Sequence, residues 1–593
     1  MAKLIKIIAA TALCLTLLLL AGCFSPYEAP DTCTVVFEDN PDIGMTEKSY
    51  TVKRFDDLQL TVRTPEGLQI TGTDYDNYTL HLNQNGEEFD FCYYSLTLYK
   101  IRYSALIRFS VEKAYGTDYF IDGKKISKTE TTPHLRLNTL AYDESFSEDK
   151  SVAVGWNTSR DGSGEHVGFG SRIKHKTNET LSLYFERLPA TAKEDLIFEI
   201  EDGCVTVTGF KGGGDLVIPE FIDGLPVTKI ASGAVRNLTA GNLVLPYSLK
   251  TIEDNAFVNI KIENLYIFDS LSDFKETAFK DYAIETLHVN AAKKPVYSCN
   301  YFATFADKAD RLAELKDTQK IIFFSGSSAR FGYDSVAFGE AFPEYEIVNM
   351  GVFAYANMQP VAQIVQNFLN RGDIVLSSPE LDAIDTQFCA GRNMHQWDFC
   401  LVEANYDLLA LVDLREFKNV FGAFAQFNAV RKDMPEKNYS DSPNDFDEDG
   451  KKVTSPSYNV YGDYIVYRPD NVDNTEFSPG KKAYFNPEHI RNEDWAGLNA
   501  VYATFRGQGA RVYFTYSPRS ALGLSADTTA ESIAELDRQM RLKLSAPVIS
   551  EAETAIMNPL YFYGTDNHLS TNGVKIYTEK VINDLKRAME NGL

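Results

Sequence analysis

Alternating apolar and polar residues dominate the N-terminal part of the chain. Short runs of this kind lie at 34–37, 58–62 and 105–111, and Asn, Asp and Gly separate them. A period of two predicts half-buried strands, and turn residues between short runs are typical of antiparallel sheet. We therefore expect β modules over residues 23–120 and 121–190.

The second module contains a recognisable order of strand, turn and strand. A strand with Gly155 and Trp156 precedes the Gly-rich turn 161–164 and a closing strand at 180–185. This order resembles the Listeria-Bacteroides repeat of bacterial surface proteins, although the final aromatic residue departs from that pattern. An ordinary hairpin with a buried Trp is the alternative. Either structure would serve as a scaffold or a binding surface.

A repeat follows in residues 191–300, where apolar positions recur every 22 residues over three copies. Four columns agree: Ile230, Ile252 and Phe274; Ala234, Ala256 and Ala278; Leu243, Leu265 and Leu287; and Leu245, Ile267 and Val289. A fixed period predicts a solenoid in which each unit buries its face against its neighbours. The entry segment 216–230 resembles leucine-rich repeats of the surface-antigen type. Such an array is either a binding face, for a protein partner among others, or a spacer.

Strand and helix patterns alternate in residues 301–593. Apolar strands are predicted at 321–324, 347–349, 374–377 and 512–516, and helices at 302–315, 358–370, 495–508, 529–545 and 571–591. This alternation predicts a mainly parallel, doubly wound α/β domain, whose ligands bind beyond the carboxyl ends of the strands. Residues 385–485 interrupt the pattern, and we expect an insertion or lid there. The chain is thus predicted to be multidomain, with β modules, a short solenoid and a C-terminal α/β domain.

The first strand of the α/β domain runs directly into the turn Ser325-Gly326-Ser327-Ser328. Its serines are candidates for a nucleophile, because Gly326 relaxes the backbone and the following amides can face a developing oxyanion. Far along the chain, His568 stands just before the last predicted helix. A serine needs such a base, since its hydroxyl is a weak nucleophile at neutral pH.

These segments resemble the SGNH (GDSL) hydrolase family, which implies a flavodoxin-like fold. Matching the first family block makes Ser327 the nucleophile and puts Gly326 and Gly332 on conserved glycines of that block, with Ser in place of its first Gly. The second block is matched by Asn349 and Gly351, and the resemblance implies that the Gly351 amide serves an oxyanion hole. Only a residue without a side chain lets the substrate oxygen come so close.

The other two family blocks depart from the pattern. The third, G-x-N-D, is replaced by Ser-Pro-Glu-Leu-Asp at 378–382, which is similar to the S-P-E of divergent SGNH-like surface proteins. The family position that supplies a side-chain amide to the oxyanion hole therefore has no match in this chain. Asn357 or Ser378 could take its place, and Ser328 is a further candidate binding residue. In the fourth block, the family places an Asp three residues before the His, where this chain has Thr565. Asp566 is then the best available orienter of His568.

The resemblance implies acyl transfer: Ser327 attacks an ester carbonyl, His568 carries the proton and Asp566 holds the imidazole. Water as acceptor gives an esterase, and a sugar hydroxyl gives an O-acyltransferase. Divergent relatives that modify surface polysaccharides make an O-acetylated glycan the expected substrate. The alternative is an adhesin or glycan-binding protein with a degenerate SGNH domain.

The N-terminus predicts export. Lys3 and Lys6 precede an apolar stretch, and Leu20-Ala21-Gly22-Cys23 resembles a bacterial lipobox. The resemblance implies a signal peptide at residues 1–22, lipidation of Cys23 and a lipid-anchored protein on the extracytoplasmic face of the cell membrane. An ordinary secretory peptide or an anchor helix is the alternative.

The net charge argues against a nucleic-acid-binding protein, and the cysteine spacing argues against a zinc protein. A formal net charge of -25 and a pI near 4.8 argue against nucleic-acid binding, which needs clustered Lys and Arg. After residue 23 six cysteines remain, and none forms a CxxC pair. Free thiols and disulfides both fit that number, and a zinc site has no ligand spacing. We predict no metal and no cofactor.

Overall fold

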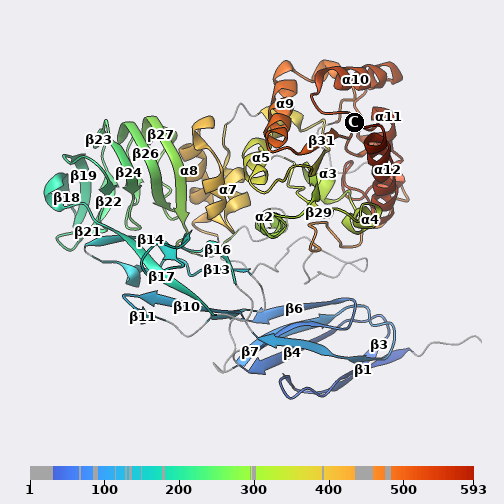
Figure 1. The fold of residues 1–593 in the computed structure, drawn as a ribbon, viewed down its shortest axis with the longest axis horizontal. Coiled ribbons are helices and arrows are strands. Elements are labelled where there is room, and N and C mark those ends of the chain that lie inside the picture. Colours follow the sequence, from blue (N-terminus) through green and yellow to red (C-terminus); the bar gives the residue numbers. More distant parts are fainter. Residues whose placement is uncertain are drawn as a thin grey trace, which may run out of the picture. The chain divides into compact units, whose positions relative to one another are not determined.

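The computed structural model describes residues 31–65, 68–83, 91–113, 115–126, 130–132, 136–148, 150–175, 180–293, 295–296, 302, 304–354, 356–389, 393–434, 458–474 and 482–592. It is a mixed α/β multidomain chain with many strands and a helical C-terminal region (Figure 1). Contacts divide it into one unit of residues 1–115 and 131–133, and a second of 116–130 and 134–593. The predicted signal peptide and Cys23 lie outside the described residues. Within these ranges, no helix has both the length and the apolar character needed to cross a membrane.

The first unit is built from short strands, most of them paired antiparallel. One sheet has the order β3 (Ser49–Lys53), β1 (Thr32–Phe37) and β8 (Ala105–Ile107), and another has the order β2 (Gly44–Met45), β4 (Leu58–Pro65), β7 (Phe91–Leu98) and β6 (Tyr78–Asn83). β5 (Leu68–Thr73) pairs with β9 (Phe109–Lys113). Every second residue of β1 is buried, and these side chains meet Leu96 and Leu98 of β7. The period of two in the sequence therefore marks the buried face.

The second unit begins with a sheet that surrounds Trp156. Its strands include β10 (Tyr115–Ile121), β11 (Lys124–Lys125), β14 (Ser151–Asn157), β15 (His166–Val167) and β17 (Thr180–Pro189), and β13 (Arg136–Asn138) pairs with β16 (Arg172–Lys174). Trp156 is fully buried, its ring lies against Tyr119, Phe169 and Phe185, and its Nε1 donates to the Leu140 carbonyl. The indole therefore fills the core and keeps its one donor bonded.

The 22-residue period reappears as strand pairing. This segment contains β18 (Leu196–Glu201), β19 (Cys204–Phe210), β20 (Leu216–Val217), β21 (Phe221–Ile222), β22 (Leu225–Ile230), β23 (Val235–Arg236), β24 (Thr239–Val244), β25 (Thr251–Ile252), β26 (Phe257–Phe268) and β27 (Phe279–Asn290). β20, β24, β26 and β27 pair in parallel, and Leu243 faces Leu265, which faces Leu287. Residues one repeat apart are thus direct neighbours, which explains why the same side chains recur.

Helices from residues 396–431 pack against the last strand of the repeats. They are α7 (Gln396–Val402), η4 (Tyr406–Leu411), η5 (Leu414–Glu416) and α8 (Val420–Arg431), and the last three contact β27 or the adjoining η3 (Glu276–Ala278) (Figure 1). The Phe279 and Phe421 rings stack at 3.9 Å. The Glu276 carboxylate accepts the amides of Phe421 and Gly422 at 2.8 and 3.0 Å. It therefore caps α8, whose own N-cap Asn419 makes no side-chain cap bond.

A four-stranded parallel sheet forms the centre of the C-terminal region. Its order is β29 (Glu346–Asn349), β28 (Lys320–Phe324), β30 (Ile374–Ser377) and β31 (Arg511–Phe514). One face packs on α2 (Thr304–Glu314), α5 (Met358–Gln366), α9 (Asn492–Gly507) and α10 (Ala530–Lys543), and the other on α4 (Ser335–Ala341) and α12 (Thr571–Glu590). All five residues of β28 are buried, as expected for a strand covered on both faces.

Candidate active site

The carboxyl end of β28 carries the predicted nucleophile. The strand ends at Phe324, and the short helix α3 (Ser327–Arg330) begins after Gly326. A Cβ at Gly326 would lie 2.3 Å from Nε2 of Gln387, a residue of α6 (Ile384–Cys389), so this turn has no room for a side chain. Ser327 is buried, with only 4% of its surface exposed. A glycine here lets the chain turn tightly and bring the serine to the edge of the sheet.

The two predicted catalytic residues meet. Ser327 Oγ lies 2.9 Å from His568 Nε2, although 241 positions separate them in the chain. The His568 amide donates to Thr565 Oγ1, its carbonyl accepts the Tyr563 amide, and its ring centroid lies 4.1 Å from that of Phe331. The imidazole is therefore held from its backbone and from one face of its ring. It is positioned without any substrate.

Asp566 has a different partner from the one its sequence position suggests. Its carboxylate forms an ion pair with Arg519 at 2.9 Å, and the same guanidinium pairs with Asp382. Among the described residues, no hydrogen bond joins Asp566 to His568. Asp566, predicted to orient His568, therefore neutralises a buried arginine instead.

The surroundings of His568 disfavour its charged form. Burial, followed by the nearby guanidinium groups of Arg468, Arg330 and Arg519, lowers the pKa of His568 from 6.5 to about 3. Removing an imidazolium from water and placing it near three cations are both unfavourable. His568 is therefore a neutral imidazole at pH 7.

The residues expected to form the oxyanion hole are engaged within the scaffold. Asn349 Oδ1 accepts the Gly351 amide at 2.9 Å, and Asn349 Nδ2 donates to the Ala329 carbonyl and to Asp463, both at 2.9 Å. Asn357 caps α5 by accepting the Gln359 amide. In this structure Asn349, Gly351 and Asn357 thus bond to the protein itself.

Gly351 is also a packing requirement. A Cβ at this position would lie 2.4 Å from the Arg330 backbone nitrogen and 2.9 Å from its Cα, and backbone atoms cannot move aside as a flexible side chain can. The close approach of β29's end to α3 therefore explains the glycine, whether or not its amide binds a substrate oxygen.

One residue of this site was missed by the sequence analysis. Glu380 follows β30, is 1% exposed, and places Oε1 3.2 Å from Ser327 Oγ and 2.6 Å from the Ser328 amide. Burial, and then the carboxylate of Asp382, raise the pKa of Glu380 above its ordinary value. The Ser-Pro-Glu segment was noticed only as a replacement for a missing block, and its position after a neighbouring parallel strand was the available signal.

Residues 458–474 cross the site and hold it together. Arg468 donates from Nε to the Leu569 carbonyl at 2.6 Å and from Nη2 to the Phe331 carbonyl at 3.2 Å. Tyr464 packs edge-on against Phe331 at 4.7 Å. This segment belongs to the expected insertion at 385–485, whereas α8 of the same stretch packs at the repeats. Whether any of it moves as a lid stays a prediction.

The depressed pKa of His568 predicts an acid-sensitive contribution to stability. The unfolded chain takes up this proton below about pH 6.5 and the folded chain only near pH 3, so stability falls as pH decreases through 6.5. Between pH 8 and pH 5 this loss is up to about 2 kcal/mol. We expect His568→Gln to lose less free energy of unfolding over this interval, measured by urea denaturation at both pH values. Equal losses in the two proteins would contradict the prediction.

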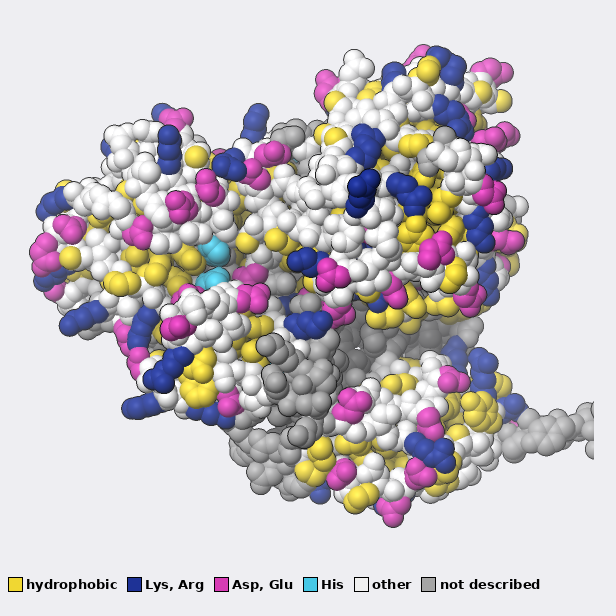
Figure 2. Space-filling view, viewed as in Figure 1, with side chains coloured by type: hydrophobic (Ala, Val, Ile, Leu, Met, Phe, Trp, Pro, Cys, Tyr) yellow, Lys and Arg dark blue, Asp and Glu magenta, His cyan; other side chains and the backbone are white. Residues whose placement is uncertain are grey.

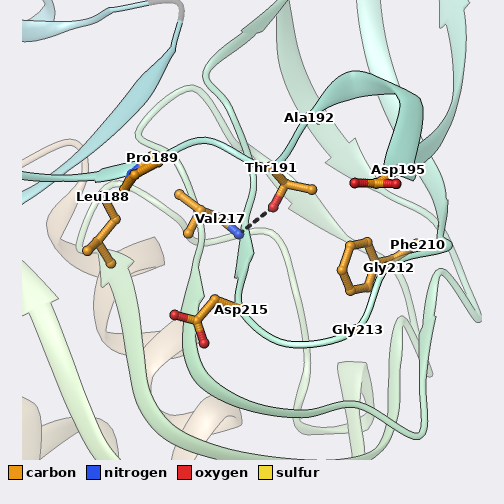
Figure 3. Close-up of a pocket in the computed structure, with 10 residues that line it drawn as sticks. All are labelled: Leu188, Pro189, Thr191, Ala192, Asp195, Phe210, Gly212, Gly213, Asp215 and Val217. Atoms are coloured by element: carbon orange, nitrogen blue, oxygen red, sulfur yellow. Dashed lines mark hydrogen bonds between the residues drawn. The ribbon is translucent and has the colours of Figure 1, made fainter.

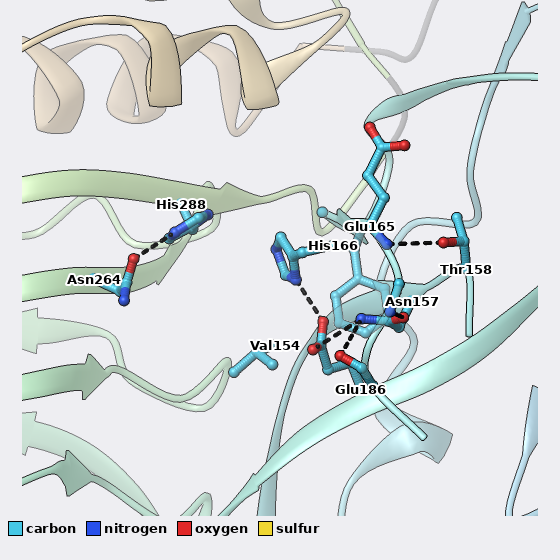
Figure 4. A network of polar contacts seen from close by, with 12 residues as sticks. Val154, Asn157, Thr158, Glu165, His166, Glu186, Asn264 and His288 are labelled. Atoms are coloured by element: carbon cyan, nitrogen blue, oxygen red, sulfur yellow. Dashed lines mark hydrogen bonds and ion pairs between the residues drawn. The ribbon is translucent and has the colours of Figure 1, made fainter. Parts of the chain in front are cut away.

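Two pockets of the structure lie away from Ser327 and His568. One of about 310 Å³ is lined by Leu188, Phe210, Asp215 and Val217, among others, where the Trp156 sheet meets the repeats (Figure 3). A polar network near it joins His166 to Glu186 and His288 to Asn264 (Figure 4).

On the face shown in Figure 2, Lys and Arg are interspersed with Asp and Glu. The described residues of that face form no continuous basic stripe of the kind that binds nucleic acid.

Comparison of the chain with protein-family models, with curated proteins and with solved structures gives no match.

Proposed function

We propose that the C-terminal domain is a doubly wound, SGNH-like domain that hydrolyses or transfers acyl groups, acetyl above all, on carbohydrate esters. The observation that carries this proposal is the 2.9 Å contact between Ser327 Oγ and His568 Nε2 at the carboxyl edge of a parallel sheet. A serine and a histidine in this relation form the core of nucleophilic acyl-transfer sites. The sheet order supports the flavodoxin-like part of the proposal.

The chemistry proceeds in two steps. Ser327 Oγ attacks the ester carbonyl while a neighbouring base takes its proton, and the alcohol leaves with that proton as the acyl-serine forms. Water or a sugar hydroxyl then takes the acyl group and restores the serine. Since His568 is neutral at pH 7, it can make a hydrogen bond to the serine without prior deprotonation.

The rest of the chain fits a protein that works outside the cell. We propose that Cys23 carries a lipid anchor at the extracytoplasmic face of the membrane, that the 22-residue units form a leucine-rich-repeat solenoid, and that the Trp156 sheet is a Listeria-Bacteroides-type module. The parallel pairing of Leu243, Leu265 and Leu287 supports the solenoid.

Covalent trapping tests the proposed function. A fluorophosphonate probe should label the purified chain, and mass spectrometry should find the label on Ser327. Because the probe reacts only with an activated serine, a chain that stays unlabelled at high probe concentration would rule the proposal out.

A binding protein with a degenerate SGNH-like domain is the second candidate. Two observations favour it: Asp566 pairs with Arg519, and the Gly351 amide bonds to Asn349. An inert site of this kind would retain acetylated glycan without releasing acetate. Glycan binding that survives Ser327→Ala, in a chain that the probe does not label, would identify it.

A further inference from the structure

Ser327 Oγ has two polar neighbours, but its hydroxyl has a single proton to donate. His568 Nε2 lies 2.9 Å away and Glu380 Oε1 lies 3.2 Å away. In one arrangement the hydroxyl donates to the imidazole, and a protonated Glu380 donates to Oγ. In the other, Nε2–H donates to Oγ, and the hydroxyl donates to an ionised Glu380. The two arrangements assign the catalytic base to different residues.

The contacts of Glu380 favour the second arrangement. The Ser328 amide donates to Oε1 at 2.6 Å, which is short for an N–H···O bond and typical of a charged acceptor. The Arg519 guanidinium also acts on Glu380 electrostatically in favour of the carboxylate. Burial and Asp382 act in the opposite direction and raise the pKa of Glu380.

The surroundings of His568 point the same way. A histidine that accepts the serine proton becomes an imidazolium, and a carboxylate on its other nitrogen normally stabilises that ion. Here the candidate carboxylate, Asp566, is paired with Arg519, and three guanidinium groups oppose the positive charge. The imidazole is therefore better suited to hold the hydroxyl than to take its proton.

We propose that Glu380 is the catalytic base that takes the proton of Ser327, and that neutral His568 positions Oγ by donating its Nε2–H. This inference rests on the proposed function and assigns the roles within the same site.

Each atom and electron pair has a defined destination in this scheme. The Ser327 O–H bond breaks as its proton moves to Glu380 Oε1, Oγ bonds to the carbonyl carbon, and the carbonyl π pair moves to oxygen. When that pair returns, the bond to the alcohol breaks, and Glu380 gives its proton to the departing oxygen. Water or an acceptor hydroxyl then loses its proton to Glu380 and attacks the acyl carbon. When this second intermediate collapses, the bond from that carbon to Ser327 Oγ breaks, and Glu380 returns its proton to Oγ.

The uncharged side chain of Gln387 lies beside the Glu380 carboxyl group. Gln387 is fully buried, and neither polar atom of its side chain has a hydrogen-bond partner within the described part of the chain. A Cβ at Gly326 would lie 2.3 Å from Gln387 Nε2 and 3.0 Å from both carboxyl oxygens of Glu380, so the two side chains converge on one point. The charged groups that act on Glu380 are Asp382 and Arg519.

The experiment compares two substitutions in the full chain. Turnover of 4-nitrophenyl acetate and the rate of fluorophosphonate labelling are measured for wild type, Glu380→Gln and His568→Gln. We expect Glu380→Gln to slow both rates at least about 100-fold, as for the loss of a catalytic base, and His568→Gln to slow them less. Glu380→Asp should recover part of the rate because it keeps the carboxylate. Glu340→Gln, at an exposed site on α4, is the matched control and should leave both rates unchanged.

A second variant keeps the test decisive if Glu380→Gln does not fold. Gln387→Glu preserves the side-chain shape and puts a second carboxyl beside Glu380, which should raise the midpoint of the acid limb of kcat/KM by about one pH unit. An unchanged midpoint would overturn the proposal. The proposal would also be overturned if Glu380→Gln were labelled at the wild-type rate while His568→Gln was inactive. If wild type itself matches Ser327→Ala in both assays, the proposed function fails, and this inference falls with it.

Discussion

A chain with Ser327 replaced by Ala should lose acetyl-ester turnover by at least about 10³-fold, because no other group at the site can form the acyl intermediate. The neighbouring Ser325 and Ser328 are both buried, and the Ser325 hydroxyl donates to the Ser378 carbonyl. Neither hydroxyl makes the contact with His568 that Ser327 makes. Release of acetate from an acetylated polysaccharide, and of 4-nitrophenol from its acetate ester, measures the loss.

The control for this substitution is Ser270→Ala, which removes the same atom from an exposed turn of the repeats. It should retain wild-type turnover. If Ser327→Ala hydrolyses the ester at the wild-type rate, Ser327 is not the nucleophile, and the 2.9 Å contact with His568 has another role.

The second large effect concerns stability. Replacing Arg431 by Met should lower the free energy of unfolding by about 3–5 kcal/mol, because it leaves two buried carboxylates without their counter-ion. Arg431 is 2% exposed and pairs with Asp269 and Glu403, each at 2.8 Å. Tyr406 also donates to Asp269, so the network joins the end of β26 to α7, η4 and α8. Urea denaturation followed by tryptophan fluorescence measures the change.

Arg415 provides the matched control. It also forms ion pairs, with Asp413 and Glu285, but its side chain is 51% exposed. Its replacement by Met should destabilise the protein far less than that of Arg431, since water solvates the carboxylates that remain. Losses of equal size at the two positions would show that burial of the Arg431 network is not what makes it important.

The C-terminal strands and the proximity of Ser327 to His568 could be predicted because their signals are local. Buried parallel strands are short apolar runs, and residues 374–377 were predicted with the bounds that β30 has. Ser327 and His568 stand next to turn and helix-start signals, which place them at one edge of the sheet. The 22-residue period likewise anticipated the register of Leu243, Leu265 and Leu287.

The partners of the charged residues could not be predicted in the same way. Asp566 was assigned to His568 because it is two positions away, but Arg519 comes from another segment and binds it instead. Glu380 reaches Ser327 across 53 positions, through the parallel pairing of β28 with β30. Sequence spacing fixes distances within one element, whereas these contacts depend on how separate elements pack.

The docking of α8 on the final repeat sets the direction in which the array can gain or lose copies. A copy added after β27 would separate Glu276 from the α8 amides and break the stack of Phe279 on Phe421. A whole copy inserted between β24 and β26 would leave both contacts in place, since each copy keeps the 22-residue register. Duplication during evolution, or by design, can therefore change the length of the repeat array upstream while the contact of α8 with the last repeat stays the same.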